Sequence, residues 1–434
     1  MYREQRDKTG EEGRDEKEKI YCTFMCGCFG FRNAGCEEKG ESGGKKEIEV
    51  VTEPAFRELV DSAADQIMGF EDDLDITVTV FSTNAEKRER EIQKLQTEIM
   101  AGKGPDVYIL DTVIENESVS NTALFTNPYK TMQSGALAPL DEYMKEDSYW
   151  ENSTYKKELL EAGQYEKRQY IIPFSCDYFV FCEPADGEQM TGTTVGEWIQ
   201  QAESSQNQEL WQAMQAISAT AGRWFVPAVD YEAQEVLFSK DRWTELATAY
   251  ISMLEQRNEE QWLENNPYEI SNINHILGAE NRQMKFIPDQ DGKKLAAVRA
   301  YGAVSMSSSY KKEAYQFLML FLNDTLEVER EKINMGTMVR GHVDPEGLPV
   351  QESAIRTKLE NSASPELIDS ICSTFSEIEG SYFVTQVEHN LYSAVGNLQS
   401  QIIGGEETDE NQLRQEAAAA AEKAWKDYRT QMAE

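Results

Sequence analysis

The feature that most constrains the fold is an alternation of strand and helix patterns that starts near residue 46. Three short β-branched runs alternate with two segments whose apolar residues have helical spacing: Ile48 to Val51, Pro54 to Met68, Ile76 to Phe81, Glu86 to Ala101 and Val107 to Leu110. Parallel strands need crossover connections, which are usually helices. The order therefore predicts an α/β fold built on a parallel sheet.

Ligands of open parallel sheets gather beyond the carboxyl ends of the strands. Glu53, Asp111 and Thr112 lie at those ends in this sequence and are therefore candidate ligand contacts. An Asp that follows a strand also commonly caps a turn or a helix. Both roles stay open for Asp111.

The rest of the chain predicts a second core. A long β-like run, Gln169 to Glu183, is able to pass from one lobe to another, and five tryptophans follow it: Trp198, Trp211, Trp224, Trp243 and Trp262. Leu295 to Met306 reads as a strand that leads into a serine-capped helix, Tyr310 to Leu322, and the chain after Pro349 is mainly helical. With 434 residues, the length predicts two to four domains or two large lobes.

Charge excludes one class of partner, and hydropathy excludes a membrane-spanning segment. The chain has 78 Asp and Glu against 42 Lys and Arg, a formal net charge of −36. Such a field repels phosphate backbones, so nucleic acid is not an expected partner. No apolar run reaches the ~20 residues that span a bilayer.

The amino terminus has the order of a signal peptide, a cleavage site and a tether. Ala34-Gly35-Cys36 resembles the lipobox of bacterial lipoproteins, although Asn33 and Arg32 depart from it. Residues 1–36 are therefore expected to be a signal segment, Cys36 a lipid anchor and residues 37–46 a tether. Two alternatives stay open: a disordered tail with incidental cysteines, and a metal site formed by Cys22, Cys26, Cys28 and Cys36.

The other cysteines show no disulfide framework. Cys176 and Cys182 lie six residues apart in one predicted strand, about 20 Å at ~3.3 Å per residue, beyond the ~7 Å limit for a bridge. They are expected to be reduced, or one of them paired with Cys372.

Six segments occur in the order that is typical of one family. They are Lys94 to Tyr108, Gly135 to Asp141, Gln169 to Ser175, Thr194 to Trp198, Phe286 to Asp289 with Asp291-Gly292, and Tyr301 to Ser305. Each is similar to a landmark of the extracellular solute-binding proteins of ABC transporters, family 1, the group that contains the maltose-binding protein. Gln256 to Ile276, where that family has part of its ligand site, matches poorly.

The resemblance implies a type II periplasmic-binding-protein-like fold with two α/β lobes, mainly parallel sheets and helices on both faces. The lobes would be discontinuous: 47–174 and 300–345 form an N-lobe, and 175–299 and 346–434 a C-lobe. The chain would cross between them near Phe174 to Tyr178, Arg299 to Ser305 and Arg340 to Pro349.

The function that the resemblance implies is a receptor for an ABC importer. It would be a monomer, anchored by lipid on the outer face of the bacterial cytoplasmic membrane, that closes by a hinge around a sugar or similar solute and delivers it to a permease. No cofactor, metal or covalent chemistry is expected.

A sugar site needs aromatic rings for the C–H faces of the sugar and side chains that both donate and accept hydrogen bonds. The expected ligand contacts lie at strand ends or predicted crossings: Glu53, Phe56, Asp111, Thr112, Asp177, Tyr178, Trp224, Tyr301 and Arg340. Each has a plainer alternative, since aromatics more often belong to a core and Arg340 to a solvated loop or an ion pair.

Enzyme motifs carry little weight. Gly40 to Gly44 matches G-x-S-x-G but lies in the tether, Ser308 and Lys311 match S-x-x-K at a helix start, and Asp289 to Gly292 reads as a turn. The three histidines form no H-E-x-x-H motif. A glycoside hydrolase with paired carboxylates is the enzymatic rival, and a sensor or docking lipoprotein of the same fold is the other alternative.

Overall fold

The computed structural model describes residues 45–112, 123–256, 265–276, 282–322, 347–404 and 409–433. Residues 141–153, which contain the two short helices α5 (Asp141–Glu146) and α6 (Tyr149–Asn152), are grouped apart from the rest of the described chain. The other described residues belong to the second unit, which contains all the sheets.

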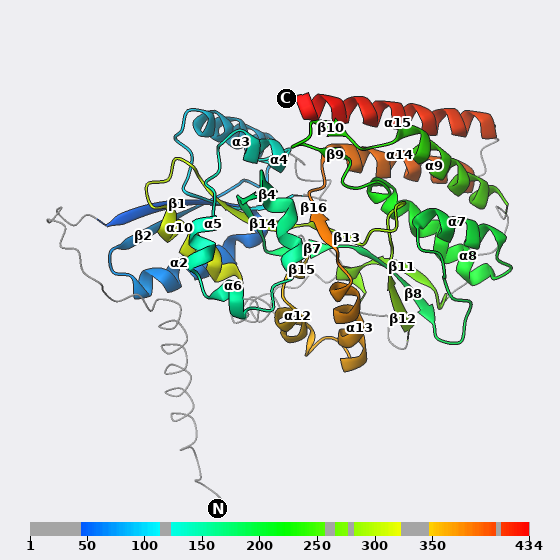
Figure 1. Cartoon of the computed structure of the whole chain (residues 1–434), viewed down its shortest axis with the longest axis horizontal. Coiled ribbons are helices and arrows are strands. Elements are labelled where there is room, and N and C mark those ends of the chain that lie inside the picture. Colours follow the sequence, from blue (N-terminus) through cyan, green and yellow to red (C-terminus); the bar gives the residue numbers. More distant parts are fainter. Residues whose placement is uncertain are drawn as a thin grey trace, which may run out of the picture. The chain divides into compact units, whose positions relative to one another are not determined.

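The first lobe begins with the predicted strand and helix order (Figure 1). In sequence order the elements are β1 (Lys46–Thr52), a 3-10 turn η1 (Pro54–Phe56), α2 (Arg57–Phe70), β2 (Leu74–Val80), α3 (Ala85–Met100) and β3 (Val107–Asp111). β1 pairs in parallel with both β2 and β3. Asn84 begins α3 because its side chain accepts a hydrogen bond from the backbone N–H of Lys87 (3.0 Å).

Two antiparallel strands complete this sheet. β14 (Ala300–Val304) pairs with β3 and with β6 (Ile171–Pro173), which gives the order β2-β1-β3-β14-β6. Among the described strands, the only parallel pair outside β1 to β3 joins β13 (Leu295–Val298) and β16 (Gly380–Tyr382). The sheets are therefore mixed and not mainly parallel: β14 enters the first sheet antiparallel to β3 after the chain crosses from β13, and the sheet β11-β8-β12 is antiparallel throughout.

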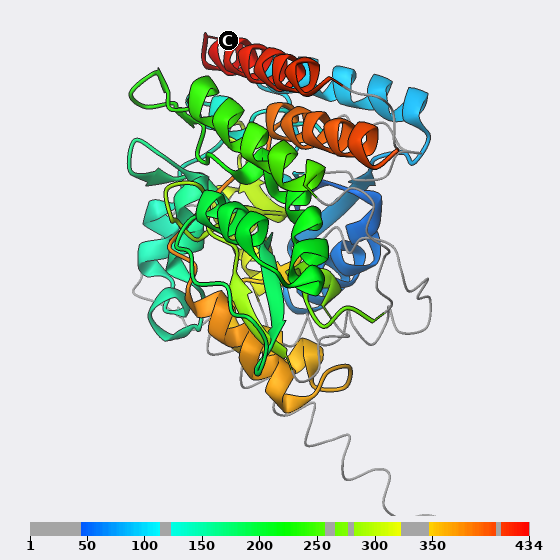
Figure 2. The same cartoon turned by 90° about the vertical axis from the view of Figure 1, so that its right-hand side faces the viewer.

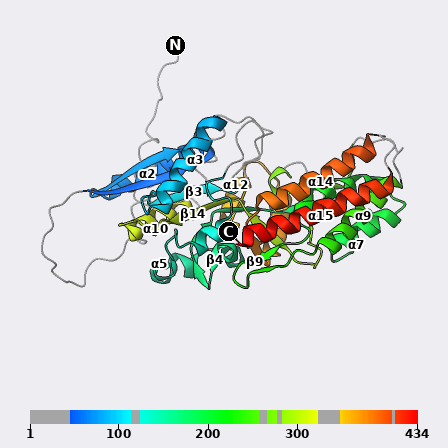
Figure 3. The ribbon, with the colours of Figure 1, turned by 90° about the horizontal axis from the view of Figure 1, so that it is seen from above.

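The second lobe is built on an antiparallel sheet, β11-β8-β12, and a large helical layer. The strands are β8 (Phe179–Pro184), β11 (Glu269–Asn272) and β12 (Arg282–Phe286), and the helices are α7 (Val195–Ser204), α8 (Gln208–Met214), η3 (Gln215–Arg223), α9 (Lys240–Glu255), α14 (Gln386–Ile403) and α15 (Glu410–Ala433). Figure 3 shows α9, α14 and α15 side by side. Four of the predicted tryptophans belong to the core of this lobe, and Trp262 lies outside the described residues.

Both predicted long strands are broken at the points where they change sheets. The first becomes β5 (Arg168–Gln169), β6, β7 (Ser175–Asp177) and β8, and the second becomes β13 and β14. At the breaks the Arg299 N–H donates to the Ser175 carbonyl (2.9 Å) and the Phe174 N–H donates to the Ala300 carbonyl (2.7 Å). These bonds hold the two crossing segments side by side.

The crossing strands also form a sheet of their own, β15-β7-β13-β16, in which β15 (Leu348–Pro349) pairs with β7. The remaining elements are α4 (Pro128–Gln133), η2 (Lys157–Gly163), β4 (Gln164–Tyr165), β9 (Val229–Asp230), β10 (Glu235–Val236), η4 (Ile273–His275), α10 (Lys311–Met319), η5 (Leu320–Leu322), α12 (Glu352–Leu359) and α13 (Pro365–Ser376). The chain after Pro349 is mainly helical, as predicted. In Figure 2, α12 and α13 lie on the opposite side of the second lobe from α14 and α15.

Two local predictions have different outcomes. No serine side chain caps α10, since the Ser308 hydroxyl accepts from the Tyr310 N–H (3.1 Å) before the helix begins. Cys176, Cys182 and Cys372 are all free and buried, so the reduced state is correct for the first two and the pairing with Cys372 is wrong.

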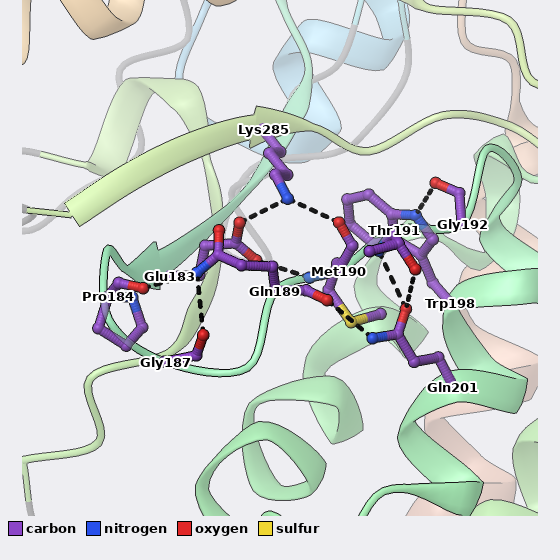
Figure 4. Close-up of polar contacts among 10 residues, drawn as sticks. All are labelled: Glu183, Pro184, Gly187, Gln189, Met190, Thr191, Gly192, Trp198, Gln201 and Lys285. Carbon is purple, nitrogen blue, oxygen red and sulfur yellow. Dashed lines mark hydrogen bonds and ion pairs between the residues drawn. The ribbon is translucent and has the colours of Figure 1, made fainter.

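A buried carboxylate fixes the loop that connects β8 to α7 (Figure 4). Glu183 is fully buried, accepts from the Met190 N–H (2.9 Å) and forms an ion pair with Lys285 on β12 (2.6 Å), whose ammonium also donates to the Met190 carbonyl (2.6 Å). From α7, the side-chain oxygen of Gln201 accepts from the Thr191 N–H of this loop, and its amide donates to the Gln189 carbonyl. The Trp198 indole on the same helix donates to the Gly192 carbonyl (2.7 Å). This loop is therefore tied to both the sheet and the helix.

Candidate functional site

Four charged side chains converge where the crossing segments meet. Arg299, 2% exposed, lies between β13 and β14, and its Nη1 donates to Asp177 Oδ2 (2.9 Å) while its Nε lies 3.5 Å from Asp111 Oδ1. Arg223, at the end of η3, lies 2.5 Å from Asp177 Oδ1. The network therefore links the end of β3 in the first lobe to η3 in the second.

This network keeps Asp177 ionised. Burial by itself raises the pKa of Asp177, but the charges of Arg223 and Arg299 and their hydrogen bonds outweigh burial and lower it to about 2. A carboxyl group with such a pKa is deprotonated at neutral pH, so Asp177 does not have the protonated form that a glycosidase acid requires.

Thr112 joins the same crossing. Its N–H donates to the Arg299 carbonyl (3.2 Å) and its hydroxyl donates to the Val298 carbonyl (2.6 Å). The structure thus brings three of the predicted ligand residues, Asp111, Thr112 and Asp177, together around Arg299, where their polar groups bond the protein itself.

Glu53 forms a second buried ion pair. Arg88 on α3 donates through Nη1 and Nη2 to the two Glu53 oxygens (2.6 and 2.9 Å), and both residues are almost completely buried. The Arg88 guanidinium also lies over the Phe81 ring at 5.0 Å. Bidentate pairing of this kind satisfies both carboxylate oxygens.

The predicted aromatic contacts are buried. Phe56 is 2% exposed, and Trp224 packs on Trp243 (ring centroids 5.9 Å apart) and donates from its indole to the Thr220 hydroxyl (2.9 Å). Tyr301 is fully buried, and its pKa is raised by burial and then by the charges of Glu53 and Asp111. In this structure these three rings are therefore part of the core, which is the alternative that the sequence left open for them.

Tyr178 has a different environment, because it lines a small hollow that we call hollow A. Its ring stacks on Phe286 (centroids 4.6 Å apart), and its hydroxyl shares a hydrogen bond with Thr374 (3.1 Å). Other lining residues include Phe179, Arg223, Asp289, Lys293 and Tyr382. Hollow A has a volume of about 20 Å³, which is room for about one water molecule.

A second hollow, hollow B, has about the same volume and lies between the lobes. Tyr129 on α4 packs against the cores of both lobes, and its ring stacks on Tyr231 of the second lobe (centroids 4.8 Å apart). The Tyr231 hydroxyl accepts from the Asn127 amide (2.9 Å). The rest of the lining includes Tyr382, Phe383, Glu388 and Tyr428. Aromatic rings and hydrogen-bonding groups from two lobes are the composition that a sugar site needs.

Three of the remaining expectations concern residues outside the described ranges. Arg340, Cys36 and the Gly40 to Gly44 motif all lie there. The predicted turn at Asp289 to Gly292 is confirmed, because Asp289 Oδ1 accepts from the N–H groups of Asp291 and Lys293 (2.8 Å each). The Lys311 ammonium donates to the Ser308 carbonyl (2.6 Å), whereas an S-x-x-K enzyme uses the hydroxyl.

The sequence reasoning missed five residues that line the two hollows: Arg223, Asp289, Tyr129, Tyr231 and Tyr382. The sequence holds a signal for two of them. Asp289 is the last residue of one of the family-like segments, and Arg223 directly precedes the candidate Trp224. The three tyrosines lie in segments without a motif, and only the fold brings them together.

Other kinds of site were sought in the same part of the chain. None of the helices described there has both the length and the apolar character of a membrane crossing. No group of three or more His, Cys, Asp or Glu side chains in those ranges is arranged to hold a metal ion.

Comparison with known proteins gives the fold. No family model matches the chain, and no curated protein matches its sequence. A solved extracellular solute-binding protein family 1 from Alicyclobacillus acidocaldarius subsp. acidocaldarius DSM 446 is similar with a TM-score of 0.57 at 12% identity, covering 89% of this chain and 99% of that chain.

Two further structures agree. The sugar-binding protein MalE from the phytopathogen Xanthomonas citri has a TM-score of 0.54 at 12% identity, covering 88% of this chain and 98% of that chain. The cyclic alpha-maltosyl-1,6-maltose binding protein from Arthrobacter globiformis has a TM-score of 0.53 at 14% identity, covering 88% and 100%. With these neighbours, the chain has the two-lobed α/β fold of the extracellular solute-binding proteins.

Proposed function

We propose that this protein is the extracellular receptor of an ABC importer and binds a carbohydrate between its two lobes. The observation that carries the proposal is hollow B, in which Tyr129 from the first lobe and Tyr231 from the second stack beside Tyr382, whose hydroxyl has no hydrogen-bond partner among the described residues. Similar proteins are named as sugar-binding, and the fold alone does not decide the ligand.

Binding would use hinge closure. Hollow B holds about one water molecule, so a sugar would enter it only if the lobes first part at Tyr129 and Tyr231. The crossing segments around Phe174 and Arg299 would act as the hinge, because they are the places where the chain passes between sheets. The lobes would comprise residues 47–174 with 300–345, and 175–299 with 346–434.

The remaining parts of the proposal concern location and partners. Cys36 would be lipidated and become the new amino terminus after removal of residues 1–35, and residues 37–46 would tether a monomeric receptor to the outer face of the cytoplasmic membrane. The bound solute would be delivered to a membrane permease unchanged, with no cofactor.

A thermal-shift screen of the purified protein against neutral mono- and oligosaccharides, amino acids and short peptides tests the ligand class. A sugar at 100 times its dissociation constant is expected to add about 2.7 kcal/mol of stability. A saturable shift with peptides or amino acids and none with sugars would refute the carbohydrate proposal. Small-angle scattering with the best sugar would show a smaller radius of gyration if the lobes close.

A further inference from the structure

Two pairs of surface elements, one pair from each lobe, meet beside hollow B. In the first lobe, α4 packs against β4 of the hairpin β4-β5, and in the second lobe, β10 of the hairpin β9-β10 packs against α15. Figure 1 shows the end of α15 near α4, and Figure 3 shows it near β4 and β9. Two polar contacts join the pairs, because Lys130 donates to the Met432 carbonyl and Glu232 accepts from the Glu166 N–H.

We infer that these two contacts form a clasp that favours the closed arrangement of the lobes and so sets how readily they part. The clasp consists of Lys130, Glu166, Glu232 and Met432, and none of the four lines either hollow. It therefore acts from outside both hollows. The inference rests on the hinge closure of the proposed function and adds to it a control by charged groups and by the end of α15.

Lys130 links α4 to the end of α15. Its ammonium donates to the Met432 carbonyl (3.0 Å) and to Gln133 Oε1 of its own helix (2.9 Å). Because α15 ends at Ala433, the Met432 carbonyl is one of the last four carbonyls, which have no partner within a helix. The helix dipole also favours a cation at this end. A charge of the first lobe thus satisfies a backbone group of the second lobe.

The hairpin β4-β5 presents a backbone N–H to the other lobe. Its two turn residues, Glu166 and Lys167, have φ of 49° and 60°, which a two-residue type I′ hairpin requires and which Gly and Asn adopt more easily. The Glu166 N–H donates to Glu232 Oε1 in the turn of β9-β10 (2.6 Å). Residues in this region persist where the surrounding contacts hold them. The bond to Glu232 therefore supports the turn and the closed arrangement together.

The turn that carries Glu232 is itself fixed. Asp230 Oδ1 accepts from the N–H groups of Glu232 and Ala233 (3.0 and 2.8 Å). The Glu232 carboxylate is thus presented from an ordered turn, and an ionised acceptor makes a stronger bond than a neutral one.

The location of the clasp limits its strength. Glu166 and Glu232 are exposed and Lys130 is half-buried. Exposed charged contacts change an equilibrium only about two- to fivefold, and salt screens them. A bias of this size suits a clasp, because the lobes are still able to part and the binding of a ligand is able to outweigh it.

The test is single-molecule fluorescence energy transfer on the full chain without added sugar. The dyes are attached to two non-canonical residues that replace Met100 on α3 and Ile403 on α14, which are 89% and 45% exposed and belong to different lobes. K130M and E232A are each expected to raise the ratio of parted to closed molecules about two- to fivefold. The double variant should raise it by about the product of the two factors. Salt at about 1 M should raise the ratio in the wild type and have little effect in the double variant.

K423M and E235A are the matched controls. Lys423 belongs to the same helix as Met432, but its ammonium bonds Asp427 of that helix (2.8 Å). Glu235 is exposed on the same hairpin as Glu232. These variants change the net charge as the clasp variants do, and they should leave the ratio unchanged. The melting temperature of all four variants should change little, which separates a shift of the lobes from a loss of folding.

The possible failures are distinguishable. If parted and closed molecules are both seen but K130M and E232A have the ratio of the wild type, the inference is wrong while hinge closure stands. Equal shifts in K423M or E235A would show a general effect of charge and would also overturn the clasp. If every variant shows one unchanging distance, with and without the best sugar, hinge closure fails together with the inference, whereas sugar binding is decided separately by the thermal-shift screen.

Discussion

Replacing Arg299 with Met should cost the protein a large part of its stability. Arg299 is 2% exposed and faces two buried carboxylates, Asp177 at 2.9 Å and Asp111 at 3.5 Å. Removing one partner of a buried ion pair costs about 3–5 kcal/mol because a buried charge is left uncompensated. A domain has only about 5–15 kcal/mol in total. The free energy of unfolding of R299M, measured by urea denaturation at pH 7, is expected to fall by about 3–5 kcal/mol.

A matched control is present on the surface. Arg356 also bridges two carboxylates, Asp369 at 2.8 Å and Glu352 at 2.9 Å, but all three side chains are exposed. Exposed pairs contribute about 0–1 kcal/mol, so R356M should lose less than about 1 kcal/mol. Equal losses in R299M and R356M would refute the argument that burial at the crossing makes the network important.

The acid limb of the stability curve gives a second measurement on the same variant. The pKa of Asp177 is about 2 in the folded protein against an ordinary 3.8, so the group stabilises the fold above about pH 4. This contribution, about 2 kcal/mol at ~1.36 kcal/mol per pKa unit, is lost as the pH falls from 4 towards 2. In R299M the pKa of Asp177 should rise, and the stability lost over this pH range should become smaller. An unchanged acid limb would contradict the assignment.

Three further predictions follow from other buried groups. The free energy of unfolding of R88M should fall by about 3–5 kcal/mol, because Glu53 is left buried without its bidentate partner. The double variant E53L/R88M should recover most of that loss in the same urea assay. No recovery would contradict the pairing. The free energy of unfolding of E183Q should fall by about 1–3 kcal/mol. Hydrogen exchange of the Met190 amide, which donates to Glu183 at 2.9 Å, should become faster. An unchanged exchange rate would contradict the conclusion that Glu183 fixes this loop. Burial raises the pKa of Cys182 to about 12 and that of Cys372 to about 11, so these thiols should react with a thiol reagent at pH 8 only after unfolding, and rapid labelling of the folded protein would show that they are accessible.

The sequence predicts those parts of the fold that depend on local patterns. The run from β1 to β3 with its two helices follows from periodicity, and the parallel pairing follows from the helical crossovers. The breaks at Phe174, Tyr178 and Arg299 were not predictable in this way, because alternating apolar residues continue across them while the pairing partner changes.

The candidate site shows more clearly what cannot be predicted from the sequence. Glu53 follows a strand, as predicted, and Asp177 lies at a predicted crossing, but their partners Arg88 and Arg299 lie 35 and 122 residues away in the sequence. A strand-end carboxylate that binds a ligand and one that forms a buried ion pair look the same until the fold brings the arginine beside it. Tyr129, Tyr231 and Tyr382 meet for the same reason, from segments that have no motif in common.

The central claim is that this chain binds a carbohydrate between two lobes and releases it unchanged. Calorimetric titration of the purified protein with neutral oligosaccharides, followed by chromatographic recovery of the sugar, tests it most directly. The account predicts saturable binding with one sugar per chain and full recovery of the intact sugar, with binding lost when Tyr129 and Tyr231 are both changed to Ala. Absence of binding across the panel, or recovery of a cleaved sugar, would contradict it.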